Sequence, residues 1–402
     1  MTGYCDCAKG CLKSVSRDVG KVLLRDNRDL TESEFQSALD VCARIKHFVD
    51  NREPYIAAHG LDRAFCLPDG LWSGKAFNDY LNTFREVSGG HYEVINHLRL
   101  FMSFFSGYSL RRLSGVPGKP SFEAVTSDLD EEIAKLLEKP DEWVNRWYRL
   151  TAGLPKNLVY SPPRMLGEIG WDVDGVVVNH DSCVYQERIN LMHDAGIFEW
   201  LQRRVENGAA IRILEIGAGH GALAYQIKKI LPACDYWICD LPESLLFSGI
   251  YLTVTRPDSK AGFGDEAPNG FTLMPNYMID RISGKFDLAI NALSFSEMSE
   301  HQLRVYAKKL SLVLEDGILF EQNQDNRHLG LLSAEEILRE YFPIQRALNG
   351  GLTWRATQGI PNLWATEARN LPPAENNLKR TLRTAAREST WLLRRARQIV
   401  SK

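Results

Sequence analysis

The chain has no uninterrupted apolar stretch of about 18 residues, the length that a helix needs to cross a bilayer. Its basic N-terminal residues Lys9, Lys13 and Arg17 are not accompanied by the apolar segment that a secretory signal peptide requires. These absences argue against a helical membrane protein and against export through a signal peptide. The sequence therefore predicts a cytoplasmic protein.

Cysteine is also scarce, with eight residues in 402. That number is too small for a disulfide framework in a chain of this length, so reduced thiols are expected. Cys5, Cys7 and Cys11 lie close together, but no Cys or His pair follows at the spacing of a zinc site. We predict no metal at these cysteines.

The chain lacks a strong excess of positive charge, because its formal net charge is −3. Residues 369–402 hold nine basic residues and only two acidic ones, which leaves −10 on the rest of the chain. An acidic body without an RNA- or DNA-binding motif does not suit nucleic acid. A small-molecule or glycan partner is predicted instead.

A glycine-rich turn is the strongest positive signal. An apolar run from Ile213 ends in Glu215-Ile216-Gly217-Ala218-Gly219-His220-Gly221, and a helix-compatible segment follows at residues 222–230. Glycine lets the backbone approach a ligand or adopt positive φ, and the next helix offers free N–H groups at its N-terminus. Ala222 stands where a dinucleotide fingerprint would have its last glycine, which argues against a dehydrogenase.

An acidic residue follows at the distance expected of a second strand. The apolar run 236–239 ends in Asp240, 19 residues after Gly221. In nucleotide-binding α/β folds a carboxylate at this place binds ribose hydroxyls. The turn and Asp240 together indicate a ligand with a ribose.

These residues resemble the S-adenosylmethionine-dependent methyltransferases of Rossmann-like fold, over residues 165–368. A narrower resemblance is to the sugar O-methyltransferases of bacterial surface-polysaccharide clusters, carried by residues 175–181, 185–188, 215–221, 240–244 and 294–298. The resemblance implies S-adenosylmethionine as cofactor, with the glycine turn on its methionine part and the strand-two acid on its ribose. It also makes Gln186 and Arg188 candidates for the cofactor's carboxylate, although Arg188 could instead form a surface ion pair.

The expected cofactor-binding set combines this resemblance with positions that follow strand ends. Its members are Gln186, Arg188, Glu215, Gly217, Ala218, Gly219, Gly221, Asp240, Leu241, Asn276 and Asn291.

Strand and helix patterns alternate through the second half of the chain. Strands are expected at residues 213–216, 236–239, 271–274, 286–291 and 317–321, with late strands between 345 and 365. A hairpin is expected around Asp174-Gly175, then a helix over 185–201, and capping boxes at Ser299 and Ser333. This alternation predicts an α/β fold with a doubly wound, mostly parallel sheet.

Four regions are predicted from these patterns. Residues 1–150 read as a helical accessory domain, with a Thr31 capping box opening a helix to residue 49 and further helices at 76–87, 91–105 and 130–139. Residues 151–165 form a proline-rich linker, 166–368 the methyltransferase domain, and 369–402 a linker with a basic amphipathic helix.

Methyl transfer to a hydroxyl requires a base, because the hydroxyl is weakly acidic. Glu297 is the first candidate, since it follows the fourth strand; its alternative role is to begin a helix. His301 lies one helical turn later, and His180, Asp181 and His328 are expected on loops beside the pocket.

A divalent metal is the alternative way to activate the hydroxyl, with oxygen ligands from Asn291, Glu297, Glu321, Asn323, Asp325 and Asn326. Asp287 lies at the start of the fourth strand and not at its end, so the usual metal-dependent pattern is not matched. The sequence favours a mechanism without a metal.

The leading hypothesis is an enzyme that methylates a hydroxyl of a free, nucleotide-linked or polymeric sugar. The alternatives are methylation of a non-sugar metabolite and a non-catalytic scaffold for glycan assembly. No oligomeric state is predicted.

In the tail, a set of residues at helical spacing is expected to share one face of the basic helix: Leu378, Leu382, Ala385, Ser389, Leu392, Ala396 and Ile399. It could lie on an anionic membrane, contact a glycosyltransferase or dock on its own domain.

Overall fold

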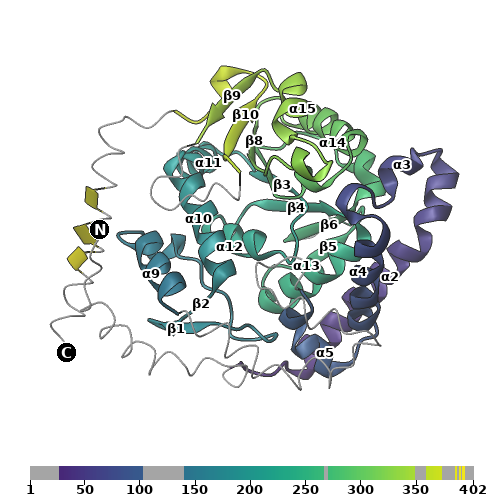
Figure 1. The fold of residues 1–402 in the computed structure, drawn as a ribbon, viewed down its shortest axis with the longest axis horizontal. Helices are drawn as coiled ribbons and strands as arrows, with labels where there is room; N and C mark the ends of the chain where they lie inside the picture. Colours follow the sequence, from purple (N-terminus) through teal and green to yellow (C-terminus); the bar gives the residue numbers. More distant parts are fainter. Residues whose placement is uncertain are drawn as a thin grey trace. The chain divides into compact units, whose positions relative to one another are not determined.

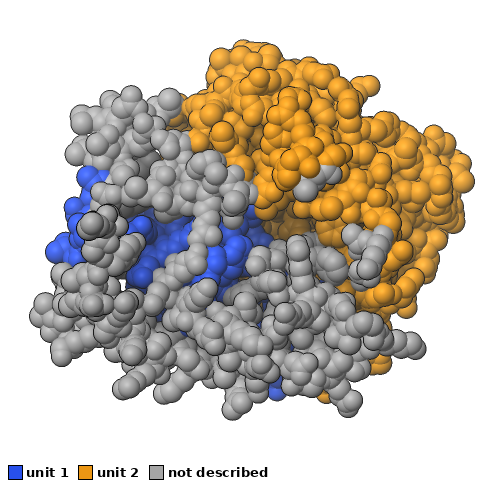
Figure 2. Space-filling model, viewed as in Figure 1, with its two compact units in different colours: residues 1–30, 96–190, 375–402 blue, residues 31–95, 191–374 orange. Residues whose placement is uncertain are grey.

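The computed structural model describes residues 27–102, 140–266, 270–348, 359–373 and six positions of the tail, Ala385, Ala386, Ser389, Thr390, Leu392 and Leu393. The chain is divided into two compact units, coloured in Figure 2. Unit 1 consists of residues 1–30, 96–190 and 375–402, and unit 2 of residues 31–95 and 191–374. Residues 31–95 thus group with the sheet described below, and the predicted domain boundary near residue 150 stays a prediction.

Unit 2 is built on an eight-stranded sheet with the order β5-β6-β4-β3-β7-β8-β10-β9 (Figure 1). The strands are β3 (Arg212–Ile216), β4 (Asp235–Asp240), β5 (Ala261–Phe263), β6 (Phe271–Pro275), β7 (Leu288–Ala292), β8 (Ile318–Gln322), β9 (Ile344–Ala347) and β10 (Asn362–Ala365). All neighbouring pairs from β5 to β8 are parallel, and β10 is antiparallel to both β8 and β9.

The predicted α/β, doubly wound, mostly parallel sheet is therefore confirmed. Strand order reverses between β3 and β7, which is the point where such sheets bind ligands at their carboxyl ends. In the dinucleotide-binding arrangement the sixth strand lies next to the fifth. Here the antiparallel β10 is inserted between β8 and β9, so the sheet differs from that of a dehydrogenase.

Helices cover both faces of this sheet. The elements of unit 2 outside the sheet are α2 (Glu32–His59), α3 (Arg63–Cys66), η2 (Gly70–Trp72), α4 (Gly74–Ser88), α5 (Tyr92–Asn96, whose last residue belongs to unit 1), α11 (Ile197–Glu206), α12 (Ala222–Ile230), α13 (Pro242–Thr255), η5 (Asn276–Arg281), η6 (Phe295–Glu297), α14 (Glu300–Val313), η7 (Arg327–Leu329), α15 (Ala334–Tyr341) and η9 (Ala368–Asn370).

Side-chain alternation assigns the two faces. Leu214, Ala289 and Leu319 are register partners and share a buried cluster with Tyr306 of α14 and Ile337 of α15. The opposite face carries α13, where a Cβ added to Gly249 would lie 2.8 Å from Val41 of α2 and 3.1 Å from Leu273 of β6. A side chain at position 249 would separate these three elements.

Most predicted boundaries on this sheet hold, with local corrections. The Thr31 capping box is present, but α2 continues to His59 because Tyr55 packs on Tyr277 and Ile56 is buried, beyond the apolar pattern that ended at residue 49. Ser299 accepts a hydrogen bond from the Gln302 amide as predicted, whereas Ser333 makes no capping bond. The three-residue strand β5 was not expected.

Unit 1 contains η3 (Leu98–Phe101), α9 (Pro140–Thr151), η4 (Lys156–Leu158) and the strands β1 (Trp171–Val173) and β2 (Val176–Val178). The strands pair antiparallel around Asp174 and Gly175, both at positive φ, so the predicted hairpin is confirmed. The predicted helix over 91–105 is interrupted: α5 ends at Asn96 and η3 follows.

The predicted single helix over residues 185–201 is wrong at both ends. α10 (His180–Asp194) begins five residues earlier, because Asn179 and Ser182 exchange side-chain to backbone hydrogen bonds of 2.7 Å. It stops before Gly196, which has a φ of 76° and precedes α11. His180 and Asp181 are therefore in the first turn of a helix and not on a loop.

The helix expected at 130–139, Cys5, Cys7, Cys11 and most of the tail face lie outside the described residues. The six described tail positions are helical. Among described helices, none combines the length and the apolar character needed to cross a membrane.

Candidate functional site

The glycine turn joins β3 to α12 at the reversal of strand order. Gly217, Gly219 and Gly221 all have positive φ, at 73°, 56° and 84°. The left-handed region is costly for residues with a Cβ, which explains why glycines alternate here. The turn leads directly into the N-terminus of α12, whose first N–H groups make an anion- or dipole-binding end.

Asn291 and Ser294, after β7, hold the turn in place. The Asn291 side-chain amide donates to the Ile216 carbonyl at 2.9 Å and to the Ser294 hydroxyl. A Cβ at Gly217 would lie 2.2 Å from Ser294 Oγ, so only glycine fits. Asn291 was expected to touch the cofactor; its side chain is fully buried in these contacts and shapes the turn.

Asp240 ends β4 beside the turn and is only partly exposed. Its carboxylate accepts a hydrogen bond from the Leu241 amide at 2.8 Å. Burial, with the nearby charge of Glu215, raises the pKa of Asp240 to about 7, although the amides of Leu241 and Ala218 and the Ser244 hydroxyl act in the opposite direction. Such a carboxylate gains from further hydrogen-bond donors.

Glu215 is the acidic residue that precedes the turn. It is buried in β3 and accepts a hydrogen bond from the Tyr236 hydroxyl at 2.8 Å. Tyr236 lies on the neighbouring strand β4, so this bond links the two strands that end at the turn and at Asp240. The predicted contact of Glu215 with a cofactor stays a prediction.

Glu297 lies in η6, the turn after β7, and keeps part of its surface exposed. Its Oε2 accepts a hydrogen bond from Trp72 Nε1 at 2.9 Å. Burial raises the pKa of Glu297 to about 7, against the effect of the indole. A carboxylate with a pKa near neutrality is suited to general-base catalysis.

The other expected residues of unit 2 lie in less suitable surroundings. Asn276 is buried and donates to the carbonyls of Phe65 and Cys66, so it fixes α3. His301 is half exposed and paired with Asp62, the N-cap of α3. His328 is exposed, and its ring nitrogen contacts the Asp325 carbonyl at 3.1 Å.

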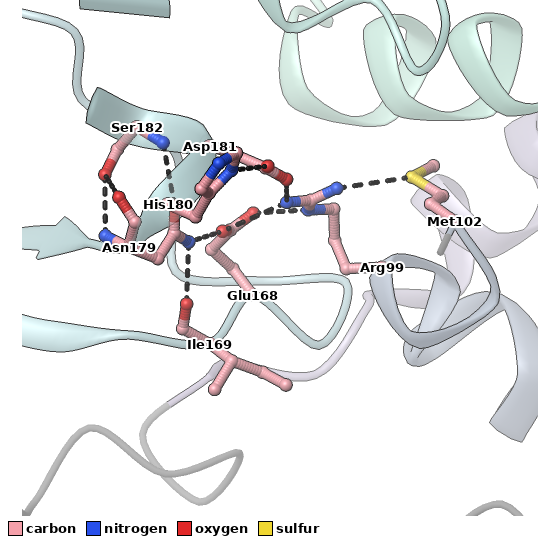
Figure 3. Close-up of polar contacts among 8 residues, drawn as sticks. All are labelled: Arg99, Met102, Glu168, Ile169, Asn179, His180, Asp181 and Ser182. Atoms are coloured by element: carbon pink, nitrogen blue, oxygen red, sulfur yellow. Dashed lines mark hydrogen bonds and ion pairs between the residues drawn. The ribbon is translucent and has the colours of Figure 1, made fainter. Parts of the chain in front are cut away.

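Four of the predicted site residues, His180, Asp181, Gln186 and Arg188, belong to unit 1. Figure 3 shows the carboxylates of Asp181 and Glu168 next to the guanidinium of the buried Arg99, at 2.9 and 2.7 Å, with His180 Nδ1 3.2 Å from Asp181. The Asn179 amide also donates to Glu168 at 2.7 Å. Asp181 is thus engaged in an internal ion pair, which ties η3 to the start of α10.

Gln186 and Arg188 lie further along α10. Gln186 is fully buried; it accepts a bond from the Tyr160 amide at 2.7 Å and donates to the Leu158 carbonyl at 3.0 Å. Arg188 is buried, with its guanidinium 5.6 Å from the centre of the Tyr185 ring. A surface ion pair is therefore wrong for Arg188, whereas its contact with a cofactor carboxylate stays a prediction.

Potential metal ligands after β8 are engaged within the protein. Glu321 is 2% exposed and accepts hydrogen bonds from Asn323, Asn362 and Trp364, and its burial raises its pKa to about 7. Asp325 is exposed and paired with Arg327. Within the described ranges, no three His, Cys, Asp or Glu side chains are grouped to hold a metal ion.

Sequence patterns did not indicate which side chains within residues 31–95 contact the rest of unit 2. Arg52 of α2 makes a bidentate ion pair with the buried Glu243 of α13, at 2.6 and 3.1 Å. The Tyr80 hydroxyl of α4 donates to Ser244 Oγ at 3.1 Å, next to Asp240. These pairs are separated by more than 160 residues in sequence, so no local signal could find them.

No family model matches the chain, and no curated protein matches it. Solved structures are similar over part of it. PigF with SAH has 14% identity and a TM-score of 0.30, and the match covers 46% of this chain and 58% of that one. WbdD has 12% identity and a TM-score of 0.32, and the match covers 45% of this chain and 40% of WbdD. Magnesium protoporphyrin IX methyltransferase from Synechocystis PCC 6803 with bound SAH has 12% identity and a TM-score of 0.30. That match covers 57% of this chain and 96% of the other.

The match spans about three fifths of the first two similar chains, PigF and a protein from Nostoc punctiforme PCC 73102. The fold assignment rests on the strand order of this chain.

Proposed function

We propose that this protein transfers a methyl group from S-adenosylmethionine to a hydroxyl of a sugar or glycan. The observation that carries the proposal is the alternating glycine turn beside Asp240, at the strand-order reversal, with Glu297 on the next strand's loop. The turn offers backbone N–H groups, and Asp240 offers an acceptor for ribose hydroxyls. The names of the similar structures are consistent with this cofactor.

The residues present fit such a cofactor chemically. The partly exposed Gly217 and Gly219 leave backbone accessible, and the partly exposed Asp240 carboxylate could accept further hydrogen bonds from two ribose hydroxyls. When bound, S-adenosylmethionine supplies an electrophilic methyl group on a sulfonium.

Glu297 is proposed as the general base. Its carboxylate would take the proton of the acceptor hydroxyl, and bound S-adenosylmethionine would supply the methyl group to the oxygen. A base contributes about 10²- to 10⁴-fold to such a step. Its pKa of about 7 lets it be substantially ionised at neutral pH and still accept a proton. His301, His180, Asp181 and His328 are the alternatives.

Binding is tested first, by calorimetry with S-adenosylhomocysteine. Asp240→Ala removes the ribose acceptor, and Gly219→Val puts a branched side chain on a left-handed backbone position next to the ligand. Each change should abolish measurable binding, and circular dichroism should report an intact fold for the Asp240 variant. Unchanged affinity in both variants would contradict the cofactor assignment.

The acceptor is tested by transfer of a labelled methyl group to nucleotide sugars, bacterial surface glycans and non-sugar metabolites. Label in the first two classes supports the sugar proposal. Label only in metabolites replaces it with the second hypothesis, and binding without any transfer favours a scaffold.

A further inference from the structure

The turn made of residues 69–73 lies directly on the loop that carries Glu297. Gly70 has a φ of 65°, and a Cβ at this position would lie 2.3 Å from the Glu297 carbonyl oxygen and 2.8 Å from the Met298 carbonyl carbon. Asp69 accepts a bond from the Gly70 amide, and the Ser73 hydroxyl donates to the Gly70 carbonyl, both at 2.8 Å. The turn is therefore fixed at both ends and fits closely against η6.

This turn aims the indole of Trp72 at the carboxylate. Trp72 Nε1 donates to Glu297 Oε2 at 2.9 Å, and its ring meets the ring of Tyr80 edge-on, with centroids 5.1 Å apart. Tyr80 is fully buried and bonded to Ser244 of α13. The indole is held from behind by a residue that is itself anchored, so its N–H has a defined direction.

We propose that Trp72 is a positioning residue for the base: its indole N–H holds Oε2 of Glu297 so that Oε1 faces the acceptor hydroxyl. The catalytic part of this inference rests on the proposed function, whereas the contact itself does not. A single well-aimed donor restricts rotation of the carboxylate and stabilises its ionised form. Loss of the donor should therefore change both the turnover and its pH dependence.

The contact is tested without any activity, by nuclear magnetic resonance of the full chain labelled with ¹⁵N in its nine tryptophans. Trp72→Phe keeps a ring against Tyr80 and identifies the Trp72 indole signal by its disappearance. That signal should titrate with a midpoint near pH 7, as Glu297 does, and should stop titrating in Glu297→Gln. A signal that ignores pH, or titrates equally in Glu297→Gln, would overturn the proposed contact.

Kinetics then test the positioning role. Trp72→Phe should lower kcat about tenfold and move the acidic limb of the pH profile to higher pH, with the cofactor's affinity changed less than about twofold. Phe77→Leu is the matched control, because the ring centroid of Phe77 also lies near that of Tyr80, at 6.2 Å. This substitution should leave the acidic limb in place.

The two proposals fail in different ways. If Trp72→Phe retains wild-type kcat and pH profile while Glu297→Gln is inactive, the positioning role is wrong and the base assignment stands. If Glu297→Gln is fully active while the Trp72 signal titrates only in the wild type, the base assignment is wrong and the contact stands.

Discussion

At the scale of single residues, the pKa of Asp240 ties cofactor binding to pH. In the free protein this pKa is about 7, and ribose hydroxyls that donate to the carboxylate should lower it. The affinity for S-adenosylhomocysteine should then fall as the pH decreases from 7 to 5.5, approaching tenfold per pH unit. Calorimetry across this range measures it. Asp240→Asn should bind weakly and show a flat profile, whereas a flat profile in the wild type would refute the ribose role.

Glu297 is expected to act on turnover and not on binding. Glu297→Gln keeps the size of the side chain and can still contact Trp72, so the affinity for the cofactor should stay within a few-fold. Turnover of the labelled-methyl reaction should fall by about two orders of magnitude or more, because a base acts only in the transition state. Near-normal turnover would direct attention to His301, His180, Asp181 and His328.

At the scale of elements, the basic tail after residue 373 is proposed to contact an anionic membrane or a glycosyltransferase. A chain that ends at Pro373, which keeps η9 and the contacts of Asn370 and Pro372, should bind cofactor and methylate a soluble acceptor as the full chain does. The full chain should sediment with anionic liposomes at low salt, because the basic residues of the tail are attracted to the anionic surface. The shortened chain should not sediment with them. If the full chain does not sediment with liposomes either, the membrane proposal fails and docking on its own domain or subunit takes its place.

The elements of the sheet could be predicted because their signals are local. An apolar run followed by Gly217, Gly219 and Gly221 specifies a strand and a turn within a dozen residues, and Thr31 with Glu34 specifies a helix start within four. The helix stop at Gly196 and the Asn179–Ser182 cap are local signals too, so both ends of α10 are predictable from the sequence. A three-residue strand such as β5 has too short a pattern to be recognised.

Contacts over long sequence distances were beyond such reasoning. Periodicity shows that α2 and α4 each have an apolar face but does not show which surface that face covers. Trp72 meets Glu297 across 225 positions, and Arg52 meets Glu243 across 191. The candidate base was therefore found from its place after a strand, while the residue that holds it was not.

At the scale of the whole molecule, three carboxylates with raised pKa values, the buried Glu321 and the partly exposed Asp240 and Glu297, should make stability depend on pH. Burial raises the pKa values of Asp240, Glu297 and Glu321 to about 7, from ordinary values near 4. Between these limits the folded state binds more protons than the unfolded one, so the free energy of unfolding should fall as the pH rises from about 4.5 to 7, by up to about 3 kcal/mol for each carboxylate.

Urea denaturation at pH 5 and pH 7.5 measures this difference, and Glu321→Gln should reduce it. Equal pH dependence in the wild type and in this variant would show that Glu321 has an ordinary pKa in the folded protein.

Placing residues 31–95 in the same unit as the sheet also has a consequence for synthesis on the ribosome. Arg52, Trp72 and Tyr80 emerge first, but Glu243, Glu297 and Ser244 are added 164 to 225 residues later. At about 5–20 residues per second, the N-terminal helices wait roughly 8 to 45 s before their partners exist. During that interval the faces of α2 and α4 that pack on α13 have no partner, so the nascent chain is most exposed to aggregation before α13 is made.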